Sequence, residues 1–192
     1  MHRRAQTAIV ALAALFSWLM LGQLILVENV GERPAFDPLS LLFYLLLLAA
    51  PACTFVPLAG WARAPLYDVE AIAGWATLGF VVAIVPPADP PTLGQFLLLL
   101  LPLTVALATL ATLVSFLVGL RVYRGDPRRH GIVRARRQGY LVAIVLIANM
   151  LLLSIGALSV TSAVLLITIA ILAEVFALTR DGQRIGRIAS RS

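Results

Sequence analysis

The sequence predicts an all-α fold: a polytopic bundle of six transmembrane helices with both termini in the cytoplasm. The composition, the apolar blocks along the chain and the positions of the charges together support this prediction. Hydrophobic residues make up 61% of the 192 residues, charged residues make up 12%, and the mean hydropathy is +0.98. A soluble domain carries about twice that charged fraction. The composition therefore excludes a soluble globular protein.

Six apolar blocks approach or exceed the length of a membrane span, which is about 20 residues for a helix. We expect the first block to be an uncleaved span, because it is too long for a signal peptide and no small-residue cleavage site follows it. All six blocks are expected to form one integral membrane domain over residues 1–192. The predicted spans are residues 5–27, 39–60, 69–85, 93–120, 139–155 and 160–178.

Three parts of this pattern need explanation. The third block is short and stops at a pair of prolines. The fourth exceeds a typical span by about eight residues, so it is either strongly tilted or kinked at Pro102, with residues 93–101 forming an oblique first segment. The last two blocks form one apolar stretch about twice as long as a span. They must reverse direction within residues 154–159, where Gly156 can adopt the positive φ of a tight turn.

The basic residues predict the orientation of the helices. All fifteen are arginines. If the connections between six spans alternate between the two sides of the membrane, fourteen arginines fall on one side and Arg33 alone falls on the other. Cytoplasmic connections are enriched in basic residues. The arginine-rich side is therefore expected to be cytoplasmic, and the chain is expected to be a multi-pass protein of the inner membrane.

Glu174 is the acidic residue that lies well inside a predicted span. An ionisable side chain there is costly, which makes it a candidate functional group. The predicted hairpin brings Glu174 beside Tyr140 and within reach of Gln138 or Arg137. We expect an ion pair or hydrogen bond that joins the fifth and sixth helices. Proton or cation handling, and a carboxylate that reaches headgroup water, are the alternatives.

Two amides lie within predicted spans. Asn149 is near the bilayer midplane, where an amide must find a partner because water is absent. The hairpin register brings it within reach of Thr168 or Ser162, so we expect a hydrogen bond between the two helices, with contact to a ligand as the alternative. Gln23 lies toward the outer end of the first span and can reach water.

The fourth span carries small and polar residues at intervals of three and four, which keeps them on one helical face. We expect this face to be a packing seam that lets another helix approach closely. Lining a polar passage is the alternative. The residues are Thr104, Ala108, Thr112, Ser115 and Gly119.

The connection over residues 121–138 carries seven arginines. We expect it to be a topogenic signal and a binding surface for anionic lipid headgroups, to which each arginine contributes about 1 kcal/mol. Docking of an acidic partner protein is the alternative, and nucleic acid is not expected because no binding fold has room here. The candidate headgroup ligands are Arg128, Arg129, Arg134, Arg136 and Arg137.

Enzyme signatures are missing from the sequence. Both histidines lie outside the predicted spans, so no zinc-binding HExxH motif is present. The single cysteine, Cys53, is expected to be a small buried apolar residue. We therefore predict no catalytic residue, no cofactor and no metal.

The segment from Arg136, Arg137, Gln138 and Gly139 to Leu178 resembles the C-terminal hairpin of uncharacterised small bacterial multi-spanning membrane proteins. In those proteins an Arg-Gln-Gly start is followed by leucine-rich helices and a late glutamate, which corresponds to Glu174 here. The family has no assigned function. The resemblance implies a bacterial origin, and hence the bacterial inner membrane, and an importance for Glu174.

The nearly uncharged spans, short connections and basic cytoplasmic face predict a non-enzymatic structural or accessory subunit. Its expected partners are anionic lipids and other membrane protein subunits. The alternative is a small-solute transport component of the substrate-capturing type, because six helices and this topology are typical of such subunits in vitamin transporters. The sequence lacks their Ala-xxx-Ala seam, for which Ala13 and Ser17 are a loose match.

Overall fold

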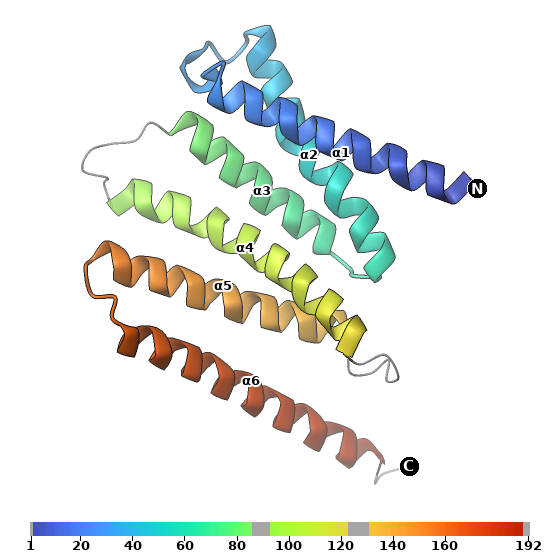
Figure 1. Cartoon of the computed structure of the whole chain (residues 1–192), viewed down its shortest axis with the longest axis vertical. Coiled ribbons are helices and arrows are strands. Elements are labelled where there is room, and N and C mark those ends of the chain that lie inside the picture. Colours follow the sequence, from blue (N-terminus) through green and yellow to red (C-terminus); the bar gives the residue numbers. More distant parts are fainter. Residues whose placement is uncertain (1, 86–92, 123–130, 190–192) are drawn as a thin grey trace. The chain divides into compact units, whose positions relative to one another are not determined.

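The computed structural model describes residues 2–85, 93–122 and 131–189 (Figure 1). Within these ranges the chain forms six α-helices and one short 3-10 helix, η1, and no β-strand. In chain order the elements are α1 (His2–Leu26), η1 (Val30–Glu32), α2 (Pro38–Ala62), α3 (Tyr67–Ile84), α4 (Leu93–Val122), α5 (Ile132–Ser154) and α6 (Val160–Ala189).

Each of the six α-helices is long and apolar enough to cross a membrane. The predicted all-α, multi-pass architecture is therefore confirmed. Large apolar side chains such as Leu12, Leu45 and Leu165 are mostly exposed, which is expected of helices that hydrocarbon surrounds. The orientation of the termini across the membrane stays a prediction.

Both neighbouring helices extend into the predicted connection over residues 121–138, and its place outside the membrane stays a prediction. The fourth helix continues to Val122, and the fifth begins at Ile132, so Arg134, Arg136 and Arg137 lie on its first two turns. Arginine and alanine are good helix formers, and arginine side chains can extend along a helix to reach the membrane surface. Hydropathy therefore marks the apolar part of this helix but misses its basic first turns.

The described contacts divide the chain into two compact units, Met1–Leu110 and Ala111–Ser192. The boundary falls within α4, and one integral membrane domain over residues 1–192 stays a prediction. In the first unit α2 packs against both α1 and α3. The buried apolar core there is formed by Leu21, Leu24, Val30, Phe43, Leu46, Leu47 and Ala50.

Side-chain hydrogen bonds connect helices within the first unit. The Trp18 Nε1 donates to Thr54 Oγ1 at 3.0 Å, which connects α1 with α2. The Tyr67 hydroxyl donates to the backbone carbonyl of Thr109 at 2.9 Å, which connects α3 with α4. A polar side chain within apolar surroundings needs such a partner, so these contacts favour one packing arrangement.

The loop that contains η1 lies directly against the end of α3. A Cβ atom on Gly31 would collide with the backbone carbonyl of Ala83. Only glycine allows the two backbones to approach this closely. Farther along, Asp37 begins α2 by accepting a hydrogen bond from the Leu39 amide, with Pro38 in the first turn.

In the second unit α5 and α6 form a helical hairpin (Figure 1). Gly156 has φ +69°, as the sequence predicts, and the Ala157 amide donates to the Leu152 carbonyl in a Schellman-type ending of α5. Ser159 and Ser162 then exchange hydrogen bonds between side chain and backbone amide. This reciprocal cap starts α6 immediately after the turn.

Pro102 does not interrupt α4, which is one helix from Leu93 to Val122. Residues 93–101 therefore belong to the same helix as the residues after them, and an oblique course of this first part in the membrane stays a prediction. The proline ring removes one backbone donor, and the Thr104 hydroxyl donates to the Leu100 carbonyl at 2.7 Å close by. A tilt of α4 in the membrane stays a prediction.

Candidate functional site

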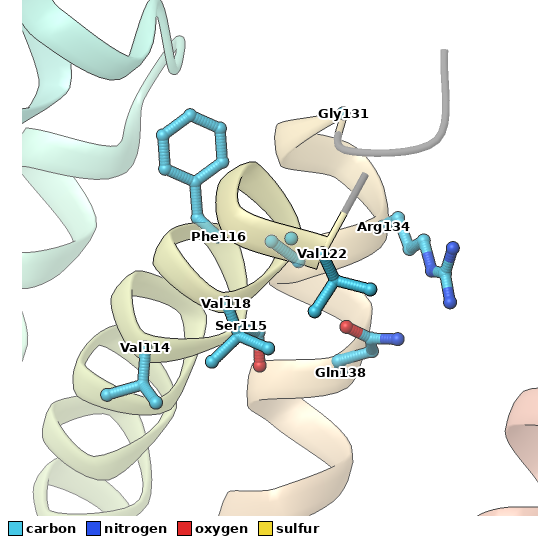
Figure 2. A pocket seen from close by; sticks show the side chains of 10 residues that line it. Val114, Ser115, Phe116, Val118, Val122, Gly131, Arg134 and Gln138 are labelled. Atoms are coloured by element: carbon cyan, nitrogen blue, oxygen red, sulfur yellow. The ribbon is translucent and has the colours of Figure 1, made fainter. Parts of the chain in front are cut away.

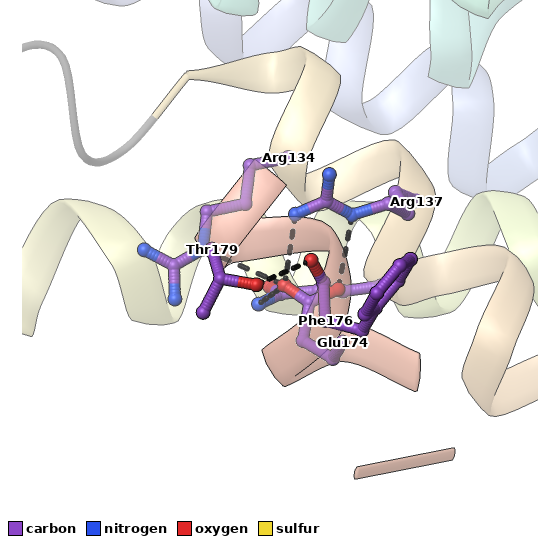
Figure 3. Close-up of polar contacts among 6 residues, drawn as sticks. Arg134, Arg137, Glu174, Phe176 and Thr179 are labelled. Atoms are coloured by element: carbon purple, nitrogen blue, oxygen red, sulfur yellow. Dashed lines mark hydrogen bonds and ion pairs between the residues drawn. The ribbon is translucent and has the colours of Figure 1, made fainter. Parts of the chain in front are cut away.

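The carboxylate of Glu174, on α6, lies against the first turns of α5 (Figure 3). Arg137 donates to it twice, from Nε to Oε2 at 3.0 Å and from Nη2 to Oε1 at 3.3 Å. The Gln138 side-chain amide donates to Oε1 at 3.0 Å, and the Arg134 Nε lies 3.9 Å from the same oxygen. We refer to these four residues as the Glu174 cluster.

The Glu174 cluster uses both oxygens of the carboxylate. Both oxygens accept hydrogen bonds, and a two-bond contact with arginine is the strongest arrangement for a carboxylate. The Glu174 side chain is 17% exposed, whereas Arg137 is 30% exposed. The Glu174 carboxylate is therefore more buried than the Arg137 side chain that contacts it. Two arginines face one glutamate, so the cluster carries a net positive charge.

The hairpin register explains how the cluster forms. Residues 134, 137 and 138 lie on one face of α5 because they are separated by three and four positions. The turn at Gly156 is almost equally far along the chain from Arg137 and from Glu174, so the antiparallel helices bring the two side chains together. The sequence predicts Gln138 and Arg137 as neighbours of Glu174, and the structure brings all three together.

Sequence reasoning missed Arg134 as a member of the cluster. The prediction places Arg134 in a connection, whereas it lies on α5, one turn before Gln138. A second missed feature is the buried face of α5, where small residues recur every four positions at Ala135, Gly139 and Ala143. That spacing is the small-xxx-small pattern of close helix packing and is visible in the sequence.

Two hollows border the Glu174 cluster. The first, about 250 Å³, lies between the end of α4 and the start of α5, and its lining includes Ser115 and Val118 of α4 and Arg134 and Gln138 of α5 (Figure 2). The second is a groove of about 570 Å³, lined mostly by apolar side chains of α5 and α6. Ser115 and Gln138 line both, so the two hollows are adjacent.

The prediction that Asn149 bonds across the hairpin is wrong. Its side-chain amide donates to the Val145 carbonyl of its own helix at 2.7 Å. The Thr168 hydroxyl likewise donates to the Val164 carbonyl of α6. Each of these two donors therefore bonds to the carbonyl one turn back on its own helix, and neither bond joins α5 to α6.

The other predicted polar residues lie apart from the cluster. Gln23 is exposed near the end of α1. On α4, Thr104 is half-buried and Thr112 is 2% exposed. Farther along the same face, Ser115 and Gly119 border the first hollow, while Ala108 is fully buried. The function of this face as a packing seam stays a prediction.

The five predicted headgroup ligands divide into two groups. Arg128 and Arg129 lie outside the residues that the structure describes. Arg134, Arg136 and Arg137 are described, and all three are half-buried on the first two turns of α5. Within the described ranges, no three histidine, cysteine, aspartate or glutamate side chains gather into a group that could hold a metal.

Comparisons with protein-family models, with curated proteins and with solved structures find no match to this chain. The resemblance of the C-terminal hairpin to small bacterial membrane proteins therefore stays a prediction. What the chain does is inferred from its own residues.

Proposed function

We propose that this chain is a non-enzymatic accessory protein of the bacterial inner membrane, which binds anionic phospholipid headgroups through the first turns of α5. The observation that carries the proposal is the placement of Arg134, Arg136 and Arg137 at the start of a membrane-length helix. Between residues 111 and 179, the described side chains include four arginines and one acidic residue, Glu174. Among these described side chains, basic residues are therefore in excess.

The position of the arginines along α5 supports contact with headgroups. They occupy residues 134–137, and the apolar part of the helix follows to Ser154. They consequently lie at the edge of the hydrocarbon, where arginine side chains can contact the phosphate groups of lipids. The first turn of α5 contains no acidic residue, and the positive end of a helix dipole adds to the attraction for an anion.

Orientation and location are part of the proposal. Fourteen of the fifteen arginines fall on one side if the six helices alternate, which supports a cytoplasmic N-terminus and C-terminus. The cytoplasmic leaflet carries the anionic lipids that attract such segments. The resemblance of the hairpin to small bacterial membrane proteins supports the bacterial inner membrane.

The exposed surface of α6 supports association with other membrane proteins. Its apolar span, Val160–Thr179, has no residue buried within the chain. Lipid or a neighbouring transmembrane helix must therefore cover the part of it that α5 leaves exposed. A subunit that presents one uncovered apolar helix is suited to an accessory role in a larger assembly.

The composition of the groove favours lipid over a polar solute. A substrate-capturing transport component needs several polar groups that line a cavity and orient its substrate. The groove of about 570 Å³ has eight apolar lining residues and three polar ones, Ser115, Gln138 and Glu174. Its walls suit hydrocarbon rather than a hydrophilic vitamin.

Lipid retention tests the proposed function. The full chain is placed in nanodiscs of equal phosphatidylglycerol and phosphatidylcholine, and the lipids that stay bound are counted by native mass spectrometry. We expect phosphatidylglycerol to be enriched more than tenfold, because the three arginines contribute about 1 kcal/mol each. Arg136→Gln should lower that enrichment about fivefold, corresponding to about 1 kcal/mol per arginine.

The control is Arg33→Gln, which also removes one arginine but lies in the connection after α1, against Glu28. It should leave the enrichment unchanged. Equal retention of the two lipids by the unmodified chain would overturn the proposal. So would an equal effect of the two substitutions.

A further inference from the structure

The apolar part of α5 is too short to cross a membrane by itself. Residues 139–154, which follow Arg137 and Gln138, contain no charged side chain and extend over about 24 Å as a helix. The hydrocarbon of a bilayer is about 30 Å thick. Only the whole helix, Ile132–Ser154, exceeds that length, and its first turns carry arginines. α5 therefore crosses the hydrocarbon only if part of its basic start is drawn inside.

The length of α6 sets the depth at which the Glu174 cluster lies. Its apolar span, Val160–Thr179, has 20 residues and is about 30 Å long, so it matches the hydrocarbon. The turn at Gly156 joins the end of α5 to the start of α6 and brings these two ends to one level. Measured from that level, Glu174 lies about 21 Å along α6 and Arg137 about 26 Å along α5. The backbone of both residues is therefore inside the hydrocarbon.

The contact between the two helices lowers the cost of this placement. An isolated arginine or glutamate inside hydrocarbon is expensive, whereas opposite charges that pair with each other are less so. Arg137 donates to both oxygens of the Glu174 carboxylate (Figure 3), and Gln138 donates to one of them. The glutamate side chain is 17% exposed, so the contact is itself shielded. Since α6 supplies the glutamate and α5 the arginine, each helix makes the crossing of the other less costly.

We infer that α5 and α6 enter the membrane together as a helical hairpin, and that the pairing of Glu174 with Arg137 draws the basic start of α5 into the hydrocarbon. Glu174 thus determines the topology of the hairpin, in addition to holding two inserted helices together. This inference goes beyond the proposed function, since it concerns how the chain reaches its transmembrane arrangement. It holds for either orientation of the chain and requires no bound lipid.

Charge reversal at Glu174 tests the inference in the full chain. In a Cys53→Ala background, Ala157→Cys places a single thiol in the exposed turn after α5. A membrane-impermeant maleimide is added to right-side-out and to inverted vesicles. With Glu174 in place, the thiol should be labelled from one side only, because α5 crosses in every chain. Glu174→Arg should leave about one tenth or more of the chains labelled from the opposite side, since an arginine within hydrocarbon opposes insertion.

A second substitution separates the ion pair from net charge. Arg137→Glu added to Glu174→Arg exchanges the two charges and should restore labelling from one side. The matched control carries Glu174→Leu and Phe176→Arg, which gives the same net charge but moves the arginine about 200° around α6. Phe176 is 68% exposed and does not line the groove between α5 and α6. Arg137→Glu should therefore fail to rescue this control.

Three results would overturn the inference. Labelling from a single side in Glu174→Arg would show that α5 crosses without this carboxylate. Equal rescue of both arginine variants by Arg137→Glu would show that net charge alone decides the topology, and rescue of neither would show that the exchanged pair does not support insertion. Loosening of the hairpin cannot imitate the expected result, because a hairpin that has crossed but packs poorly still exposes residue 157 on the original side. Equal retention of the two lipids in the nanodisc experiment would contradict the proposed function and leave this inference standing.

Discussion

Arg137 and Glu174 are 37 positions apart in the sequence, yet they share two hydrogen bonds, at 3.0 and 3.3 Å, between α5 and α6. The contact lies near the end of the hairpin that is remote from the turn at Gly156. The turn fixes one end of the helix pair and this ion pair fixes the other. Together they determine which faces of the two helices meet, and hence where the groove lies.

Replacement of Glu174 by glutamine should loosen α6. The substitution removes the charge that two arginines face, and because these arginines are about 30% exposed the loss is moderate, about 1 kcal/mol. Hydrogen–deuterium exchange of the α6 amides in detergent micelles should accelerate about fivefold. Glu32→Gln, in the exposed connection after α1, is the control and should leave α6 unchanged. Equal exchange in the two variants would show that the ion pair does not hold the hairpin.

Replacement of Gly156 by alanine should destabilise the hairpin turn. Nothing lies within 4 Å of the position of a new Cβ, so no collision arises, but φ is +69° and an alanine there costs about 1 kcal/mol. The matched control is Gly60→Ala, which also meets no neighbour but lies within α2, where alanine is favoured. Thermal unfolding should show a lower midpoint for Gly156→Ala and an equal or higher one for Gly60→Ala. A lower midpoint for both would contradict this explanation.

The pairing of Glu174 with α5 was predictable because it depends on chain topology. The register of the antiparallel hairpin follows from an apolar stretch twice as long as one span. Gly156 marks its turn, and Glu174 lies near the end of its second half. The helical first turns of α5 were not predictable from hydropathy, because arginine lowers hydropathy while it favours helix. The role of Arg134 was missed for the same reason.

The partner of Asn149 was predicted wrongly because two satisfactory solutions exist. An amide within hydrocarbon needs an acceptor, but the carbonyl one turn back on its own helix is always available. The groove also could not be predicted, since it depends on how far α5 and α6 stand apart beside Ser115. That separation comes from side-chain packing, which helical periodicity does not specify.

Replacement of Gly31 by alanine should destabilise the first unit. The new methyl group would occupy the position of the Ala83 carbonyl, so the loop must move away from the end of α3, at a cost of about 2 kcal/mol. Gly22→Ala is the control, because nothing lies within 4 Å of its Cβ position. All three tryptophans lie in the first unit, so thermal unfolding can be followed by their fluorescence. A midpoint equal to that of Gly22→Ala would show that the loop does not need this close approach.

Replacement of Asn149 by leucine should leave the hairpin almost unchanged. The side-chain amide donates to the Val145 carbonyl of its own helix, so its removal breaks no contact with α6, and the loss should be about 0.5 kcal/mol or less. Amide exchange of α6 should therefore match that of the unmodified chain, whereas Glu174→Gln in the same experiment should accelerate it. Thr168→Val serves as the control on α6, since its hydroxyl donates to Val164 within that helix. If Asn149→Leu accelerated amide exchange in α6 as much as Glu174→Gln, Asn149 would connect the two helices. The hydrogen bond to Val145 would then not explain why an asparagine lies within the membrane.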